Sequence, residues 1–151
     1  MFSFRPVAFT DLETICTHRR LMFAEMGTDA AILATATASH AVWLREHLAD
    51  GRYFGFLAED AGEVIGGVGL RVMDFPPNPN HPESDRRGFV LDMYVQPDYR
   101  GQGIAYDLMQ LGEEEFKRRG IPYATLQASA KGRSLYEKLG WQSTTEMGKK
   151  L

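Results

Sequence analysis

Apolar side chains in the first part of the chain recur every three or four positions, which is the repeat of a helix with one buried face. This repeat covers Leu12–Met26. A capping box at Thr10–Glu13 comes just before it, and Gly27 follows it as the expected helix end. Phe2–Val7 alternates between apolar and polar residues instead. The pattern therefore predicts a short strand followed by a first helix.

A second helical stretch runs from Thr28 and Asp29, which can cap it, to about Asp50. Its middle, Thr35–Ser39, favours helix only weakly, because Ser and Thr side chains compete for backbone hydrogen bonds. The apolar spacing nevertheless continues to Leu48, so we expect one helix here.

The repeat changes to that of strands after Gly51. Tyr53–Glu59 and Val64–Met73 read as two strands, joined by a hairpin turn at Asp60–Glu63. The second strand contains glycines at positions 66, 67 and 69, which weaken a strand interior. They predict a bulge or a close approach of another part of the chain.

A proline-rich loop separates this hairpin from the next strand. Phe75–Pro82 contains four prolines, which exclude regular structure because proline has no backbone N–H. A loop of this length is either functional or a plain surface excursion. Gly88–Gln96 then reads as an apolar, central strand that ends at Pro97.

The remaining elements complete a mixed α/β pattern. We expect a helix at Gln102–Arg119, a strand at Tyr123–Ala128, a short helix at Lys131–Leu139 and a final extended segment at Trp141–Leu151. The order is β-α-α-β-β-β-α-β-α-β. It predicts one domain over residues 1–151, with a mixed sheet covered by helices on both faces.

Composition and charge narrow the range of functions. The net charge of −3 argues against a nucleic-acid partner, which usually requires a basic face. The single cysteine, Cys16, excludes an internal disulfide, and the four histidines have no metal-ligand spacing, so no metal is expected. The start of the chain lacks the features of a signal peptide. No apolar run approaches the roughly 20 residues that span a bilayer, so we expect a cytoplasmic protein without a membrane partner.

The clearest candidate chemistry lies between the central strand and the helix that follows it. Arg100-Gly101-Gln102-Gly103-Ile104-Ala105 places two glycines at a helix start, where backbone N–H groups are unpaired and the helix dipole is positive. Such a turn can bind an anion, and Arg100 adds donors that suit phosphate oxygens. The alternative is a tight strand-to-helix turn without a ligand. The third glycine of a Rossmann turn and the Gly-Lys pair of a P-loop are both missing.

Val95–Ala105 resembles the coenzyme A motif of the GNAT superfamily of N-acetyltransferases, Q/R-x-x-G-x-G/A. Arg100, Gly103 and Ala105 meet that motif. Ser134–Trp141 resembles a second signature of the family, L-Y-x-K-x-G-F, with Trp141 in place of Phe. The order of elements also agrees with the family from end to end. The resemblance implies a GNAT-like fold, with a central, mostly antiparallel, twisted mixed sheet that splits between two strands.

The resemblance also implies where a cosubstrate binds. In the family, acetyl-coenzyme A (acetyl-CoA) lies in the split, here between Gly88–Gln96 and Tyr123–Ala128. Its pantetheine arm would pair with Met93, Tyr94 and Val95, and its pyrophosphate would lie on the amides of Gln102, Gly103, Ile104 and Ala105, beside Arg100 and Gly101. Ser129 and Arg133 are further candidates for contacts with it. The family often has Asn and Ala where this chain has Ser129 and Gly132.

Two residues are candidates for catalysis. The resemblance implies that Tyr136 is the acid that protonates the leaving thiolate; the alternative is a tyrosine that only packs. Asp92 lies in an apolar strand, with its side chain expected opposite Leu91 and Met93. It is either a general base or a structural acid with a partner.

The acceptor is less defined. Glu25 and Phe75 are candidates for contacting it; the alternative for Glu25 is a solvated helix residue. The four histidines are expected on the surface or as satisfied core residues. We expect an N-acetyltransferase that moves an acetyl group from acetyl-CoA to a primary amine of a small molecule or a protein, within a ternary complex. The alternatives are a module that binds acyl-CoA without turnover and a structural domain without a ligand. A homodimer is plausible for the family.

Overall fold

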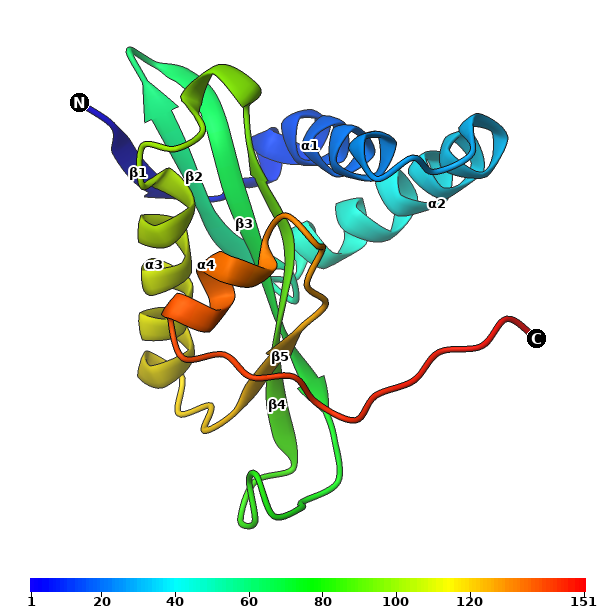
Figure 1. The fold of residues 1–151 in the computed structure, drawn as a ribbon, viewed down its shortest axis with the longest axis vertical. Helices are drawn as coiled ribbons and strands as arrows, with labels where there is room; N and C mark the ends of the chain where they lie inside the picture. The colour runs from blue at the N-terminus through cyan, green and yellow to red at the C-terminus, as the bar shows by residue number, and fades with distance from the viewer.

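The fold is a five-stranded sheet with four helices, seen in a computed structural model that describes residues 1–151 (Figure 1). In chain order the elements are β1 (Ser3–Pro6), α1 (Leu12–Glu25), α2 (Ala30–Ala49), β2 (Phe54–Asp60), β3 (Glu63–Asp74), β4 (Arg86–Val95), α3 (Ile104–Arg118), β5 (Ala124–Leu126) and α4 (Arg133–Lys138). Short 3-10 turns at Phe9–Asp11 and Pro97–Tyr99 precede α1 and α3.

The sheet has the mixed arrangement that the sequence predicts. The strand order is β1-β2-β3-β4-β5. Strands β1 to β4 pair with one another in antiparallel fashion, and β5 runs parallel to β4. The parallel pairing covers only three residue pairs, from Gly88 with Ala124 to Val90 with Leu126. β4 continues for five residues beyond that point, so the two strands part within the sheet.

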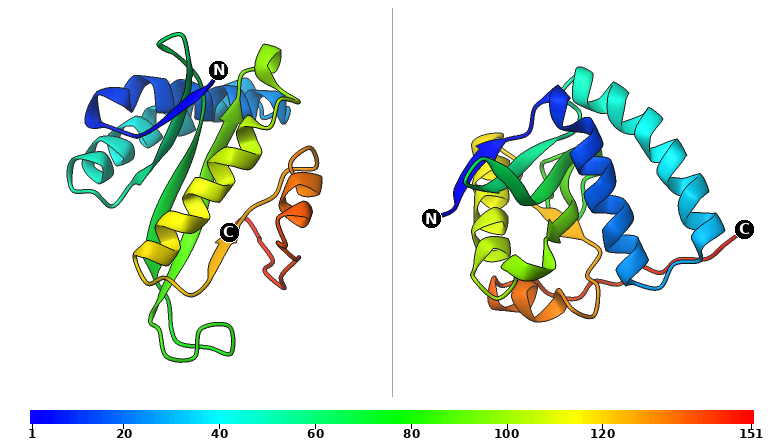
Figure 2. Two further views of the ribbon diagram at one scale, coloured as in Figure 1. Left: turned by 90° about the vertical axis from the view of Figure 1, so that its left-hand side faces the viewer. Right: turned by 90° about the horizontal axis from the view of Figure 1, so that it is seen from above.

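Helices cover both faces of the sheet, as expected. α1 and α2 lie on one face, and α3 and α4 lie on the other (Figure 2). The α3 face holds the main apolar cluster, in which Leu70, Ile104 and Leu108 are almost completely buried. The α1 and α2 face holds a cluster of only three buried apolar residues, Ile15, Leu44 and Tyr53. No helix combines the length and apolar composition needed to cross a membrane.

A bulge in β4 changes the face on which Asp92 lies. The register with β3 shifts between Gly67 and Gly69, and Asp92 has a left-handed backbone with φ of 56°. As a result, Leu91 and Asp92 both contact the α1 and α2 face, while Met93 packs against the α3 cluster. The prediction that Asp92 points opposite Leu91 is wrong, because strict alternation holds only in a strand without a bulge.

The glycines of β3 mark the irregularity that the sequence predicts. Gly69 faces the ring of Tyr53, and a Cβ at this position would lie 2.6 Å from Cζ and 2.9 Å from Cε2 of that ring. The absence of a side chain therefore lets Tyr53 cross over β3. Its hydroxyl then donates to Asp92 on the neighbouring strand at 2.9 Å.

The two ends of the chain differ from the sequence expectation. The final segment, Trp141–Leu151, forms no strand, and β5 is shorter than the predicted Tyr123–Ala128. No backbone hydrogen bond involves residues 142–151, so this tail has no partner strand along which to pair. At the other end, the Thr10 capping box does not form. Asp11 instead accepts from the Ala8 N–H at 2.7 Å and pairs with Arg5, which ties β1 to the start of α1.

The second helix is continuous despite its weak middle. The Asp29 carboxylate caps it by accepting from the N–H groups of Ala31 and Ile32. At the other end, Leu44 and His47 are buried against the sheet and α1. Capping and packing together hold one helix through the Thr35–Ser39 stretch, where propensity alone is low.

The proline-rich loop is ordered by a histidine. His81 is only 1% exposed; its ring accepts from Arg87 and bonds to the Ser84 carbonyl, and it stacks on Tyr123. This is the satisfied core role expected for a histidine. The loop is therefore tied to β4 and β5 at the end of the sheet far from the glycine turn (Figure 1).

Candidate active site

The glycine turn leaves a row of backbone donors unpaired. Gly101 and Gly103 adopt left-handed φ values of 76° and 85°, and Gly103 is the N-cap of α3. No N–H of Gly101, Gln102 or Gly103 has an acceptor in the protein, and the first three N–H groups of α3 have none because of helix geometry. A Cβ at either glycine would meet nothing within 4 Å, so the turn faces open space. The turn therefore offers the unpaired backbone donors that an anion site needs, and its contact with a pyrophosphate stays a prediction.

Arg100 links this turn to the first helix. Its Nε donates to the Val95 carbonyl at 2.8 Å, and its Nη2 donates to both carboxylate oxygens of Glu25 at 2.8 and 3.0 Å. The guanidinium also lies over the ring of Tyr94. Two residues singled out separately in the sequence, Arg100 and Glu25, are thus partners. In this arrangement Arg100 holds the end of β4 against α1, and its contact with phosphate stays a prediction.

The split between β4 and β5 begins directly before the bulge. Pairing ends at Val90 and Leu126, after which Leu91–Val95 has no neighbour on its β5 side. These five residues include Met93, Tyr94 and Val95, the expected contacts of a pantetheine arm. Only Gln96 and the 3-10 turn Pro97–Tyr99 separate the strand from the glycine turn, so an unpaired strand edge and a set of unpaired helix donors lie close together in the chain.

Asp92 has two partners on the α1 and α2 face. One carboxylate oxygen accepts from Arg19 at 2.5 Å, and the other accepts from the Tyr53 hydroxyl at 2.9 Å. The side chain is 2% exposed, so these bonds offset the cost of burying its charge. Burial, together with the negative charge of Asp92, raises the pKa of Tyr53 well above its usual value, which keeps that hydroxyl a donor. Of the two roles open for Asp92, the geometry supports the structural one.

Tyr136 lies in α4, on the α3 side of the sheet. It is 9% exposed and belongs to the main apolar cluster, and its hydroxyl has no hydrogen-bond partner in the protein. Burial raises the pKa of its phenol. A Cβ at Gly132 would lie 3.0 Å from the Tyr136 ring, so the small residue before α4 makes room for it. A protonated hydroxyl without a partner is able to donate to a ligand.

The other two residues near α4 are engaged locally. The Ser129 hydroxyl accepts from the Gly132 N–H at 3.2 Å and so helps to begin α4. Arg133 donates to the Ser143 hydroxyl at 2.9 Å, which joins α4 to the tail. Both side chains keep donors that a ligand could use, and their contact with a cosubstrate stays a prediction.

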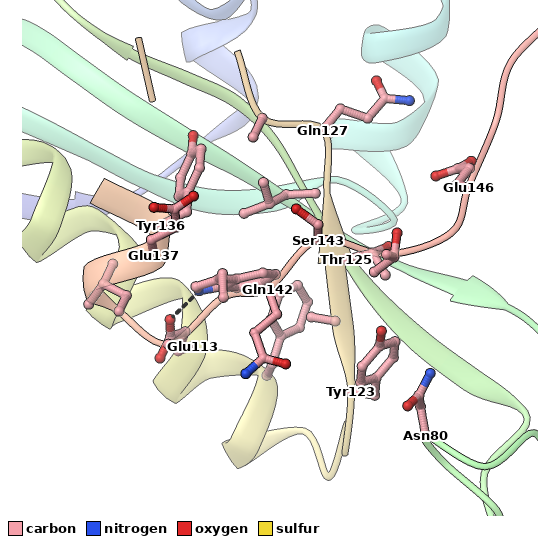
Figure 3. A pocket seen from close by; sticks show the side chains of 18 of the residues that line it. Asn80, Glu113, Tyr123, Thr125, Gln127, Tyr136, Glu137, Gln142, Ser143 and Glu146 are labelled. Carbon is pink, nitrogen blue, oxygen red and sulfur yellow. Dashed lines mark hydrogen bonds between the residues drawn. The ribbon is translucent and has the colours of Figure 1, made fainter. Parts of the chain in front are cut away.

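A large cavity lies along the outer side of β5, between α4 and the tail (Figure 3). Its volume is about 940 Å³. Tyr136, Thr125 and Ser143 line it, and the Trp141 indole N–H closes one side by donating to Glu113 at 2.8 Å. The glycine turn does not line this cavity. The glycine turn and this cavity are therefore separate features of the molecule.

A second cavity lies between α1 and α2, where sequence reasoning did not expect one. Its volume is about 290 Å³, and Cys16, Arg19, Arg20 and Phe23 line it from α1. From α2, His40 lines it with both ring nitrogens buried and without a hydrogen-bond partner. The expectation of a surface or satisfied-core role is therefore wrong for His40. Burial lowers the pKa of its imidazole below the ordinary value, so the ring is neutral at pH 7.

The structure brings most of the expected residues to one end of the sheet. The glycine turn, Arg100, Glu25 and the unpaired edge of β4 lie together there. Phe75 lies at the opposite end of β4, where its ring stacks with the Arg87 guanidinium, so the structure does not place it at this site. No three His, Cys, Asp or Glu side chains come together as metal ligands.

Comparisons with known proteins agree with this geometry. The model of the Acetyltransferase (GNAT) family matches residues 17–141. Acetyltransferase SG1711 of Sodalis glossinidius (strain morsitans) is 34% identical over 101 residues, which is 63% of this chain and 63% of the length of that relative.

Solved structures are similar over the whole chain. A GCN5-related N-acetyltransferase from Ralstonia eutropha JMP134 has a TM-score of 0.98 and 44% identity, covering 100% of this chain and 99% of that one. A predicted acetyltransferase from Clostridium acetobutylicum, solved with acetyl-CoA, has a TM-score of 0.90 and 26% identity, covering 100% and 96%. The split sheet, the glycine turn and these matches all lead to one assignment: the chain belongs to the GNAT family of acetyltransferases.

Proposed function

We propose that the protein is an N-acetyltransferase that uses acetyl-CoA to acetylate a primary amine by direct attack in a ternary complex. The observation that carries this proposal is that the unpaired β4 edge, Leu91–Val95, is followed within a few residues by the unpaired N–H groups of the glycine turn. An extended amide-containing arm can add to such an edge as a further strand. A pyrophosphate at the end of that arm then reaches the start of α3, where N–H groups and the helix dipole both favour an anion.

The residues present fit this cosubstrate. The turn combines left-handed glycines, six N–H groups without acceptors and open space in front of them. Acetyl-CoA supplies the acetyl group as a thioester, which is reactive toward a neutral amine. The chain's contribution is to hold that thioester along β4, to exclude water there and to provide hydrogen bonds to the atoms that gain negative charge.

The transfer needs two proton movements. The amine nitrogen forms a bond to the acetyl carbon, the carbon–sulfur bond breaks, the nitrogen loses a proton and the thiolate sulfur gains one. A lysine-like amine has a pKa of ~10.4, so most of it must first lose a proton to water or to a base. Tyr136, with a protonated hydroxyl and no partner, is the proposed donor to the sulfur.

Coenzyme A binding tests the first half of the proposal. Thermal unfolding with and without coenzyme A is the measurement, because a ligand that binds only the folded state raises the melting temperature. Gly103→Ala and Gly120→Ala form a matched pair: both positions have left-handed φ, 85° and 72°, and open space around a new Cβ. Each substitution costs about 1 kcal/mol of stability. Only Gly103→Ala should weaken coenzyme A binding, and no shift in the wild-type protein contradicts the proposal.

Replacing Tyr136 tests the second half. Tyr136→Phe keeps the ring in the apolar cluster and removes only the hydroxyl, so we expect turnover to fall at least about tenfold with little change in coenzyme A affinity. The measurement is the release of free thiol from acetyl-CoA in the presence of an amine. An unchanged turnover number would show that the hydroxyl takes no part in the reaction. The same assay separates a transferase from a domain that binds acyl-CoA without turnover.

A further inference from the structure

The cavity between α1 and α2 has a chemical character that the rest of the site lacks. Of the ten residues that line it, two are arginines, one is a histidine and none is an aspartate or glutamate. This is a local excess of positive charge in a protein whose net charge is −3. The wall also includes the apolar side chains of Phe23, Ile32 and Leu33. The cavity therefore combines cationic and aliphatic surfaces in one small space.

The polar groups of this cavity have unused hydrogen-bonding capacity. Arg20 is exposed and makes neither a hydrogen bond nor an ion pair within the protein. Arg19 gives one nitrogen, Nη1, to Asp92 and keeps its other donors. His40 has two buried ring nitrogens with no partner, an arrangement that costs free energy unless a ligand or water satisfies it. As a neutral imidazole, it offers one donor and one acceptor.

The cavity is connected to the proposed reaction site through Arg19. Arg19 lines the cavity, and its guanidinium bonds to Asp92 in the bulge of β4. The bulge is followed directly by Met93, Tyr94 and Val95, along which the thioester is proposed to lie. A molecule held between the two helices thus lies on the α1 and α2 side of that strand, with the Arg19 side chain between the molecule and the strand.

We infer that this cavity binds the acceptor, and that the acceptor is a small primary amine carrying a carboxylate and a short aliphatic group, as an aliphatic amino acid does. This inference rests on the proposed function. Arg20 and the spare donors of Arg19 bind the carboxylate, His40 bonds to the polar atoms beside it, and Phe23, Ile32 and Leu33 contact the aliphatic part. The volume of about 290 Å³ lies at the lower limit of small-molecule sites, which suits a molecule of this size. A polyamine would place further positive charge beside the two arginines.

Matched acceptors test the inference on the full chain with acetyl-CoA. The probes are L-leucine, L-leucinamide and 3-methylbutylamine, with spermidine as a polycation and the other aliphatic amino acids as further carboxylates. We expect kcat/KM to be at least about tenfold higher for an aliphatic amino acid than for its carboxylate-free analogues, since a hydrogen bond to a charged group is worth this much. The amide has the less basic amine and is the more reactive analogue intrinsically, so amine basicity cannot produce a preference for the amino acid over the amide. 3-Methylbutylamine has a more basic amine than L-leucine, so the comparison with the amide decides the test.

Variants locate the effect in the cavity. Arg20→Ala should raise KM for the amino acid at least about tenfold and leave KM for the amide unchanged. Arg20→Lys, which keeps the positive charge, should raise KM for the amino acid less than Arg20→Ala does. Arg118→Ala is the control, because Arg118 is an exposed arginine on α3. It should change KM for neither the amino acid nor the amide. His40→Phe should also raise KM, yet leave the melting temperature unchanged or higher, because it removes buried nitrogens that lack partners.

The outcomes separate this inference from the proposed function. If coenzyme A does not stabilise the protein, the proposed function fails. If coenzyme A does stabilise it, but a carboxylate-free amine reacts as well as the amino acids, only the inference about the acceptor is overturned. The same holds if no carboxylate-bearing amine is acetylated at all, or if Arg20→Ala leaves KM unchanged.

Discussion

The two faces of the sheet are built for different purposes. The face under α3 and α4 holds twelve buried residues in one cluster, all of them apolar except for the tyrosine hydroxyl. The face under α1 and α2 holds a cluster of only three buried apolar residues, beside the buried Tyr94, His18 and Asp92, and it contains a cavity. Close packing stabilises a fold, whereas a cavity with unpaired polar groups reduces stability and leaves room for a ligand. The comparison indicates that α3 supports the sheet, and it agrees with the proposal that the acceptor binds between α1 and α2.

The same truncation on the two faces should have very different effects. Leu108 in α3 is fully buried, so Leu108→Ala should lower the free energy of unfolding by about 3 kcal/mol. Leu33 in α2 is partly exposed and lines an existing cavity, so Leu33→Ala should cost under about 1 kcal/mol. Urea unfolding measures both. Equal losses would mean that the two faces are packed equally well.

Removing the buried charge on the α1 and α2 face should have an intermediate effect. Asp92→Asn keeps the shape of the side chain, and Asn tolerates the left-handed backbone at this position. It removes the ion pair with Arg19, so we expect a loss of about 2 kcal/mol in urea unfolding.

The matched control for this change is a surface ion pair. Asp50→Asn acts on a pair with Arg52 that is largely exposed, and stability should stay nearly unchanged because water screens such pairs. If both variants behave alike, burial of Asp92 does not strengthen its interactions.

Acidification should affect the two faces unequally, with the smallest effect of the three tests. Burial lowers the pKa values of His18 and His40, both on the α1 and α2 face, below the ordinary 6.5. The unfolded chain therefore binds protons more readily than the folded one, so stability is full above pH 6.5 and is lost as the pH falls through the folded-state pKa values. Unfolding at pH 7.5 and pH 5.5 measures this loss. In the His18→Gln, His40→Phe double variant, the loss of stability between pH 7.5 and pH 5.5 should be smaller. If the double variant loses as much stability as the wild-type protein, other groups cause the loss.

The helices and strands were predictable from the sequence, whereas contacts and cavities between them were harder to predict. Apolar spacing identified α1, α3 and the β2–β3 hairpin, and the glycines of β3 indicated an irregularity, because these signals are local. The face of Asp92 was not predictable from alternation, since the bulge depends on how β4 pairs with β3. The cavity beside His40 was missed for a related reason. It depends on the distance between two helices, and the only sequence signal was the small Ala and Thr side chains of α2.

The candidate site likewise has parts that the local sequence indicates and parts that depend on distant contacts. The glycine turn was recognisable because a helix start and two glycines define its chemistry over six adjacent residues. The pairing of Arg100 with Glu25 joins residues 75 positions apart, and nothing in either local sequence indicates it. The predicted order ends with an extended segment at Trp141–Leu151, but a strand also needs a neighbour, and the tail has none.

The left-handed backbone of Asp92 limits which residues this position can accept during sequence drift. Most side chains pay about 1–2 kcal/mol for that conformation, and Gly, Asn and Asp are the types that tolerate it best. Gly has no group to bond with Arg19 and Tyr53, and Asn lacks the charge. Aspartate is therefore the residue type that both tolerates this backbone conformation and bonds to Arg19 and Tyr53 with a negative charge. A neutral replacement would need a compensating change at Arg19, so the two positions should vary together among related chains.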